Sequence, residues 1–315
     1  IHSLTSFQSP CSLHLRNSFR LFDLLWWTLI DFVQMASDSK QPVVSTAWLN
    51  DQLRKKRDDF AILDVTWFSD KNTIHHFSKE HLMHASQMDI FYGVENTSLY
   101  PRNIPDAPTF QMNARGSAVN NDNHVVIYEK TGKFGFFTGA RAWWLFKLFG
   151  HENVSVLDGG LEKWIADGYE TTNIMVKKKE GDFTAKLTPR WLKRFEDMKE
   201  NLTLQKAQVC DSRDPSLFTR SAYDPKTGHY PGAVNIPFPK LFDPDTKSLK
   251  KLDDLKKVYT DAGIDLSKPL IGMCNSGMSS CSLVLAAHLC GCPDVAVYHG
   301  GFKEWKKRAD PSEIE

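Results

Sequence analysis

The sequence contains one pattern of segments twice, about 145 residues apart. Each copy has an apolar run, a Gly-rich turn, a helical stretch, a second apolar run and a Gly-Gly pair before a Trp-bearing helix. The two runs lie at 124–128 and 154–157 in the first copy, and at 269–273 and 295–298 in the second. A repeat of this length is a whole domain, because solenoid units span only about 20–50 residues. The sequence therefore predicts two copies of one domain.

Short apolar runs that alternate with helical stretches are typical of βαβ units, whose strands form a parallel sheet. Such sheets are covered by helices on both faces. We therefore predict an α/β fold with two tandem domains, at 40–172 and 190–310. The charged, turn-rich segment at 177–181 favours a linker at 173–189, and residues 1–39 would form an N-terminal extension.

Charge and cysteine content exclude several classes of protein. Lys and Arg number 39 against 38 Asp and Glu, a balance that argues against nucleic acid or a membrane as the main partner. The six cysteines show no disulfide framework, which favours a reducing compartment. Neither copy has a Rossmann glycine fingerprint or a Walker loop, so nothing in the sequence indicates nucleotide binding.

Residues 1–34 permit three interpretations: a targeting segment, sequence that precedes the true start, or a folded part of the protein. They contain an apolar stretch at 21–33, which two Asp residues interrupt and which is too short to cross a bilayer. The basic, Ser-containing segment before it has features of a mitochondrial presequence. Alternatively, these residues precede the true start of the protein, at Met35. We therefore expect a cytoplasmic or mitochondrial protein.

Cys274 ends an apolar run and opens the turn 275–280, whose residues are mostly small. Ligands of open α/β sheets bind at the carboxyl ends of the strands. A turn of small residues can point several amides into one hollow, where they and the positive end of the next helix favour an ionised thiol and a bound anion. Cys274 is therefore the candidate nucleophile, and the alternative is a small buried cysteine that only packs. We expect Cys281, Cys290 and Cys292 to be packing residues, because their spacing does not match a zinc site.

The sequence around these features resembles the two-domain rhodanese family. The resemblance rests on His-Tyr-Pro-Gly-Ala-Val-Asn-Ile-Pro-Phe at 229–238, on the two Gly-Gly…Trp elements, and on Cys-Asn-Ser-Gly-Met-Ser at 274–279. It extends over roughly residues 42–308. Within the family it points to the members that use 3-mercaptopyruvate.

The resemblance implies a sulfurtransferase that works through a persulfide. The Cys274 thiolate would take a sulfur atom from 3-mercaptopyruvate, release pyruvate, and pass the sulfur to a thiol such as reduced thioredoxin, or to cyanide. This chemistry needs no metal and no organic cofactor. Glu129 stands at the matching position of the first copy, and a carboxylate cannot carry sulfane sulfur. The first copy therefore resembles the inactive domain of the family.

The resemblance also assigns roles to individual residues. Ser276 would hydrogen-bond the donor or relay a proton, and its alternative role is to cap the following helix. The rest of the substrate-binding turn would be Asn275, Gly277, Met278 and Ser279. His81, in the first copy, matches a histidine to which proton transfer is assigned in the family. The alternative for His81 is a buried histidine that hydrogen-bonds the backbone.

The basic residue that would anchor the donor's carboxylate departs from the family pattern. Family members place an Arg where Leu217 stands here. The remaining candidates are Arg220, Arg213 and Lys226. We expect Arg220 to be the anchor, because a guanidinium can bind a carboxylate through two hydrogen bonds. Arg213 has the alternative of pairing with a neighbouring Asp.

Three other functions fit parts of the sequence. Thiosulfate is a dianion, and family members that prefer it place basic residues directly after the cysteine. Asn275 and Ser276 are neutral here. Thiosulfate:cyanide sulfurtransferase is therefore the alternative activity and not the first. A phosphatase of the Cys-x5-Arg type is disfavoured, because Ser280 stands where the Arg is required. A non-catalytic rhodanese-like module, which binds a partner or only carries sulfur, is favoured by Leu217 and disfavoured by the intact turn after Cys274.

Overall fold

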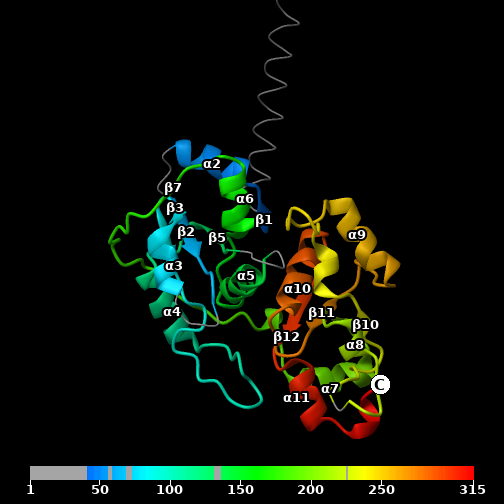
Figure 1. Ribbon diagram of the computed structural model, residues 1–315. Coiled ribbons are helices and arrows are strands. Elements are labelled where there is room, and N and C mark those ends of the chain that lie inside the picture. Colours follow the sequence, from blue (N-terminus) through cyan, green and yellow to red (C-terminus); the bar gives the residue numbers. More distant parts are fainter. Residues whose placement is uncertain (1–40, 56–58, 69–72, 131–135, 225) are drawn as a thin grey trace, which may run out of the picture. The chain divides into compact units, whose positions relative to one another are not determined.

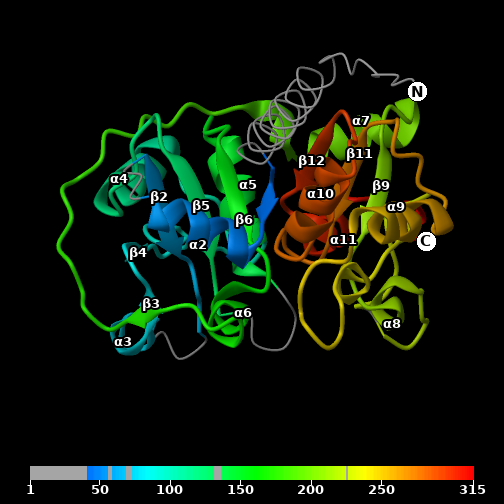
Figure 2. The ribbon, with the colours of Figure 1, turned by 90° about the horizontal axis from the view of Figure 1, so that it is seen from above.

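Two five-stranded parallel sheets form the framework of the protein (Figures 1 and 2). The computed structural model describes residues 41–55, 59–68, 73–130, 136–224 and 226–315, so the N-terminal extension and Met35 lie outside the described residues. Residues 41–315 form one unit that contains both sheets. We call residues 41–172 the first half and residues 189–315 the second half.

The two sheets have the same topology. The strands of the first half are β1 (Val43–Val44), β2 (Phe60–Asp64), β4 (Ala85–Gln87), β5 (His124–Tyr128) and β6 (Val154–Leu157), in the order β1-β6-β5-β2-β4. Those of the second half are β8 (Leu192–Lys193), β9 (Gln208–Asp211), β10 (Val234–Asn235), β11 (Leu270–Met273) and β12 (Val295–Tyr298), in the order β10-β9-β11-β12-β8. All neighbouring strands within these two sheets are parallel. Read from β8, the second order repeats the first with each strand replaced by its counterpart, so the predicted duplication and α/β fold class are confirmed.

Helices cover both faces of each sheet. In the first half they are α2 (Thr46–Arg54), α3 (Thr73–Lys79), α4 (Ala107–Gly116), α5 (Thr138–Leu148) and α6 (Gly160–Ala166). In the second half they are α7 (Phe195–Leu204), α8 (Pro215–Phe218), α9 (Leu252–Asp261), α10 (Ser280–Leu289) and α11 (Gly301–Arg308), with short 3₁₀ turns η1 (Pro189–Trp191), η2 (Phe238–Leu241) and η3 (Pro311–Glu313). Leu63 and Leu270 pack into one hydrophobic cluster, whereas their strand neighbours Ile62 and Ile271 pack into two others. Because adjacent side chains of a strand point to opposite faces, both faces of each sheet are buried.

The two halves share one hydrophobic core around α5 and α10, which pack against each other (Figure 2). Trp143 and Trp144 of α5 are fully buried in this core, as is Leu283 of α10. Large aromatic side chains bury the most apolar area, so these residues contribute much of the stabilisation. The core therefore fixes α10, whose first residue follows the Cys274 turn, against a helix of the first half.

Two further features complete the fold. A small antiparallel pair joins β3 (His81–Leu82) to β7 (Thr171–Thr172) within the first half. The helices in the described part of the chain are all too short or too polar to cross a membrane.

The segment 173–189, which we expected to be a linker, is bound to the first half over part of its length. The amides of Gly181 and Phe183 donate to the carbonyls of Arg115 and Val119, and the Phe183 side chain is buried. The Lys-rich run predicted a solvated segment, and Lys177 is indeed exposed. The apolar residue after that run is what attaches the segment to the core.

In the first half, the position equivalent to Cys274 holds a buried carboxylate. Glu129 follows β5, and its oxygens accept the N–H of Phe137 at 2.9 Å, the hydroxyl of Thr138 at 2.7 Å, and the N–H of Gly139. These donors surround the start of α5, where amides and the helix dipole stabilise negative charge. Burial opposes them and raises the pKa of Glu129 to about 7. The first-half turn therefore binds an acidic group that belongs to the chain itself.

We expect Glu129→Gln to change how the stability of the protein depends on pH. Folding raises the Glu129 pKa from 4.5 to about 7, so its protonation stabilises the wild type below pH 4.5, and this stabilisation is lost as the pH rises through 7. The Gln variant lacks this titration, so the wild type should lose about 2 kcal/mol relative to it between pH 5 and pH 8. Urea unfolding at both pH values measures the difference. The exposed Glu95→Gln is the control, and a pH-independent difference for Glu129→Gln would contradict the assigned titration.

Candidate active site

Cys274 directly follows β11 and lies where the chain turns into α10. The side chain is buried, and its Sγ accepts the N–H of Met278 at 3.1 Å and the hydroxyl of Ser280 at 3.5 Å. The amides of residues 275–277, 279 and 280 have no hydrogen-bond partner among the described residues. These amides and the N-terminus of α10 are therefore free to bind an anion beside the sulfur.

Two glycines let the Cys274 turn pack closely against the turn after β12. A Cβ on Gly277, whose φ is +73°, would lie 2.7 Å from the carbonyl oxygen of His299. A Cβ on Gly301, whose φ is +60°, would lie 2.5 Å from the carbonyl oxygen of Cys274. Glycine alone adopts these φ values without strain and leaves this space. The N–H of Phe302 fixes the contact by donating to the Cys274 carbonyl at 2.7 Å. The Gly-Gly element of the repeat thus holds the Cys274 turn in place.

The other residues of the turn differ in their exposure and contacts. Ser276, Gly277 and Met278 are buried, Ser279 is half-buried and Asn275 is exposed. The Ser279 hydroxyl lies 2.7 Å from the hydroxyl of Ser212. The Ser276 hydroxyl makes no hydrogen bond to a described residue, and the N-cap position of α10 is Ser279. The alternative role of Ser276 as a helix cap therefore finds no support, and its hydroxyl is available to a ligand.

The other four cysteines of the described residues are poorer nucleophiles than a thiol held by the turn. Burial raises the pKa of Cys281 to about 12 and that of Cys290 to about 11, and it also raises the pKa of Cys210 and Cys292. Such thiols stay protonated at neutral pH, and the thiolate is the reactive form. Packing is therefore the role that the structure supports for them.

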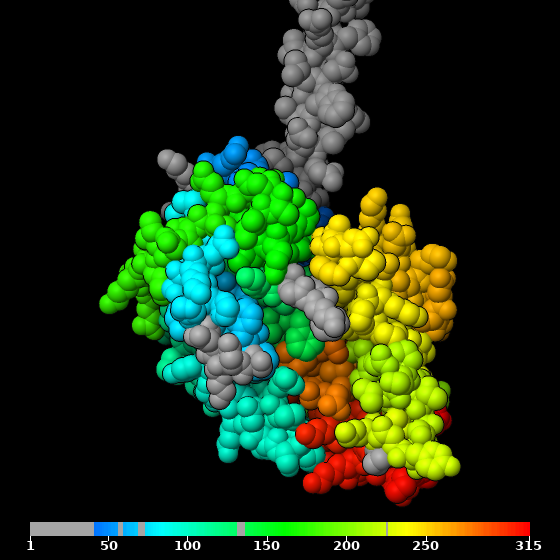
Figure 3. All heavy atoms as spheres, viewed as in Figure 1, coloured from blue at the N-terminus to red at the C-terminus, as the bar shows by residue number. Residues whose placement is uncertain are grey.

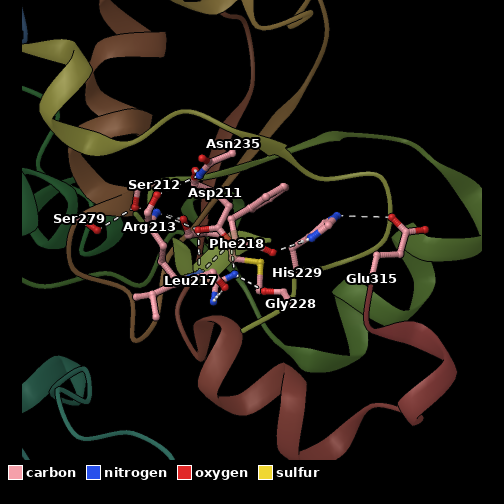
Figure 4. A network of polar contacts seen from close by, with 11 residues as sticks. Asp211, Ser212, Arg213, Leu217, Phe218, Gly228, His229, Asn235, Ser279 and Glu315 are labelled. Carbon is pink, nitrogen blue, oxygen red and sulfur yellow. Dashed lines mark hydrogen bonds and ion pairs between the residues drawn. The ribbon is translucent and has the colours of Figure 1, made fainter. Parts of the chain in front are cut away.

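Arg213 is committed to contacts within the second half (Figure 4). Its guanidinium donates to both carboxylate oxygens of Asp211 at 2.6–3.0 Å and to the carbonyl of Gly228 at 2.7 Å. Its face lies 4.0 Å from the centre of the Phe302 ring, and both members of the ion pair are buried. Removing Arg213 from this pair would leave a buried carboxylate uncompensated. The structure thus supports the local pairing that was the alternative for Arg213, not a substrate anchor.

Arg220 and Lys226 are exposed in the segment that follows α8. The Nη1 of Arg220 donates to the carbonyl of Ile314, close to the end of the chain. The amide of Lys226 donates to the carboxylate of Asp224 at 2.8 Å. No hydrogen bond or ion pair joins either side chain to the described residues of the Cys274 turn. Arg220, which we expected to anchor the donor's carboxylate, is therefore turned toward the C-terminal segment.

His81 is buried in β3. Its Nδ1 lies 2.7 Å from the carbonyl oxygen of Phe77, and its ring stacks on the Phe77 ring with the centres 4.0 Å apart. Because a carbonyl only accepts hydrogen bonds, Nδ1 carries the proton. These contacts favour the backbone-bonded alternative for His81.

Two arginines of the first half that the sequence did not indicate are linked to the Cys274 turn, Arg141 directly and Arg102 through its backbone. The guanidinium of Arg141, on α5, donates to the carbonyl of Gly277 at 2.8 Å and to that of Arg102 at 3.2 Å. Figure 3 shows the segment around residue 100 against the C-terminal α11, where the Tyr100 hydroxyl donates to Glu304. The sequence offers one signal for Arg141, a charged residue within a largely apolar helix.

Arg102 also lines a cavity of about 560 Å³ in the first half, together with Trp67 and Asp89. Its guanidinium carbon lies 5.7 Å from the centre of the Trp67 ring, and its side chain has no hydrogen bond or ion pair with a described residue. Asp89 already accepts the N–H of Phe91 at 2.9 Å. The cavity thus presents an unpaired cation close to the segment that Arg141 ties to the Cys274 turn.

Comparison with known proteins agrees with this geometry. The family of the rhodanese-like domain matches residues 45–167 and 194–308. Thiosulfate sulfurtransferase of Gallus gallus is 37% identical over 275 residues, which cover 85% of this chain and 94% of that protein. 3-Mercaptopyruvate sulfurtransferase of Homo sapiens is 34% identical over 281 residues, which cover 86% and 94%. The solved structure of SseA from Escherichia coli, a 3-mercaptopyruvate sulfotransferase with the rhodanese fold, aligns with a TM-score of 0.72 and 28% identity over 83% of this chain and 98% of that chain.

The family match falls on both halves of the duplication, and both relatives are covered almost end to end. The nucleophile candidate, its turn and the pairing of an active with an inactive half are the features that the sequence led us to expect of such proteins. The chain belongs to the rhodanese family and is a sulfurtransferase.

Proposed function

We propose that the enzyme takes sulfur from 3-mercaptopyruvate and carries it on Cys274 as a persulfide. The observation that carries the proposal is the hydrogen bond from the Met278 amide to the Cys274 sulfur, beside turn amides that have no other partner among the described residues. Hydrogen-bond donors at this position stabilise the thiolate, which is the nucleophilic form. The same donors stabilise the persulfide, which is also an anion.

In the first step, the thiolate attacks the sulfur of 3-mercaptopyruvate. A sulfur–sulfur bond forms and the carbon–sulfur bond breaks, with its electron pair leaving on carbon as the enolate of pyruvate. The enolate takes up a proton and departs as pyruvate, while Cys274 keeps the sulfur. A covalent intermediate of this kind divides the transfer into two easier steps.

In the second step, a thiol acceptor such as reduced thioredoxin attacks as its thiolate. The outer sulfur of the persulfide takes up a proton and the acceptor thiolate bonds to it, while the electrons of the broken sulfur–sulfur bond restore the Cys274 thiolate. Cyanide would accept the sulfur in the same way and leave as thiocyanate. We further propose that the enzyme works in a reducing compartment, the cytoplasm or the mitochondrion, because the cycle requires Cys274 as a free thiol.

The chemistry of the turn favours 3-mercaptopyruvate over thiosulfate. Residues 275–277 carry no basic side chain that would compensate a dianionic donor. The buried hydroxyl of Ser276 is free to donate to the keto or carboxylate group of 3-mercaptopyruvate. Thiosulfate remains the second candidate donor, because the Gallus gallus relative bears the name thiosulfate sulfurtransferase.

We propose Arg102 as the anchor for the donor's carboxylate, in place of Arg220. Arg213 forms an ion pair with Asp211, and Arg220 donates to the carbonyl of Ile314. The guanidinium of Arg102 lines a cavity and has no hydrogen bond or ion pair with a described residue, and Arg141 ties the Arg102 backbone to the Cys274 turn. A guanidinium in this position can bind a carboxylate through two hydrogen bonds.

Cys274→Ser should abolish the turnover of both donors, because a hydroxyl cannot take the place of the thiolate as sulfur carrier. Pyruvate release from 3-mercaptopyruvate with a thiol acceptor, and thiocyanate release from thiosulfate with cyanide, measure the two activities. We expect the wild type to have the higher kcat/KM for 3-mercaptopyruvate. The control is Cys290→Ser, a half-buried thiol at the end of α10, which should stay active. Undiminished turnover by Cys274→Ser would refute the proposal, and turnover of neither donor by the wild type would favour a non-catalytic module.

Arg102→Ala should raise the KM for 3-mercaptopyruvate roughly tenfold or more, since hydrogen bonds to a charged group contribute about 1.5–3 kcal/mol. Arg220→Ala and Lys226→Ala should change that KM less than about twofold, because neither side chain bonds to the Cys274 turn. Steady-state kinetics of the three variants with one acceptor decide between them. If KM rises in Arg220→Ala and is unchanged in Arg102→Ala, Arg220 is the anchor, as the sequence indicated, and Arg102 is not.

A further inference from the structure

Arg141 lies at the contact between α5 of the first half and the Cys274 turn of the second. Its side chain is 1% exposed. Nη1 donates to the carbonyl of Gly277 at 2.8 Å, and Nη2 donates to the carbonyl of Arg102 at 3.2 Å. The guanidinium also lies over Trp144, 4.5 Å from the ring centre. These contacts hold the group in one place beside the turn.

The carbonyl that Arg141 binds and the amide that contacts the sulfur belong to one peptide unit, between Gly277 and Met278. In a planar trans peptide, the C=O and the N–H point in opposite directions. Arg141 binds the oxygen end of this unit, and the N–H end points at Sγ of Cys274, 3.1 Å away. The thiol of Cys281 donates to the same oxygen at 3.3 Å. Arg141 therefore aims the amide and, because hydrogen bonds in a chain polarise one another, strengthens it as a donor.

No carboxylate of the described residues pairs with Arg141, and its Nε has no partner there. Burial lowers the pKa of Arg141, while negative charge on Cys281 or Cys274 raises it. Burial keeps Cys281 protonated, with a pKa of about 12, and it lowers the pKa of His299 well below its usual range, so that ring is neutral. Arg102 adds positive charge. Among these neighbours, Cys274 is thus the group that can offset the buried cation.

We propose that Arg141 is a positioning residue for the sulfur-transfer reaction, which aims the Met278 amide at Cys274 and compensates the negative charge of the thiolate and of the persulfide. The proposal rests on the proposed function of Cys274. A buried cation interacts strongly with a nearby anion, because little water screens the pair. The half that lacks a nucleophile therefore takes part in the chemistry of the other half.

Three variants test this role. Arg141→Met removes the charge and the donors. Arg141→Lys keeps the charge, but an ammonium group lacks the planar guanidinium that binds two carbonyls at once. Arg115→Met is the matched control, because Arg115 lies on α4 of the same half and also donates to backbone carbonyls, those of Phe183 and Asp182. The first measurement is the rate at which iodoacetamide alkylates Cys274 at pH 7 without any sulfur donor, followed by mass spectrometry. The second is kcat and KM for 3-mercaptopyruvate.

We expect alkylation and kcat to fall roughly tenfold or more in Arg141→Met and by a smaller factor in Arg141→Lys. KM should rise in Arg141→Met as well, because Arg141 also holds the backbone of Arg102. Arg115→Met should behave as the wild type. Equal or faster alkylation in Arg141→Met would overturn the proposal, because a purely structural role would loosen the turn and expose the thiol. If Arg141→Met does not fold, Arg141→Lys decides, and wild-type alkylation and kcat in that variant would overturn the proposal. Absence of donor turnover in the wild type would count against the proposed function, and the alkylation rates would still test Arg141.

Discussion

The hydrogen bond from the Met278 amide to the sulfur of Cys274 is the contact on which the site depends. It forms because β11 ends just before the cysteine and α10 begins after a short turn, so the chain must fold back over the sulfur. Gly277 and Gly301 allow this path, since the turn passes too close to its neighbours for any side chain at either position. A buried polar group is stable only when it is satisfied. The fold therefore supplies a donor to the one thiol of the described residues that borders free amides.

The two halves show how one architecture serves two purposes. After β5, the amides of Phe137 and Gly139 at the start of α5 are occupied by the Glu129 carboxylate. After β11, a cysteine replaces the acid, and most amides of the turn keep no partner among the described residues. The carboxylate of Glu129 thus satisfies donors at the start of α5, whereas the free amides after Cys274 can bind an external anion. The first half still has a place in the site, through the helix that follows its own turn.

Sequence alone predicted the features that depend on local order. The apolar runs are strands, the duplicated sequence forms the same sheet topology twice, and Cys274 follows a buried strand. Each of these features depends only on the order of residues along the chain. The charged residues were harder to place, because their partners are set by tertiary packing. Arg220 donates to a carbonyl 94 residues away and Arg141 to one 136 residues away, and no local spacing indicates either contact. The pairing of Arg213 with Asp211, two residues apart, is the kind of contact that could be anticipated.

The proposed persulfide on Cys274 can be measured as the mass of the protein after incubation with 3-mercaptopyruvate in the absence of an acceptor. We expect a gain equal to one sulfur atom, located by peptide mapping on Cys274 and lost when a thiol acceptor is added. Pyruvate release with no sulfur on Cys274, or sulfur carried by another cysteine instead, would contradict this expectation.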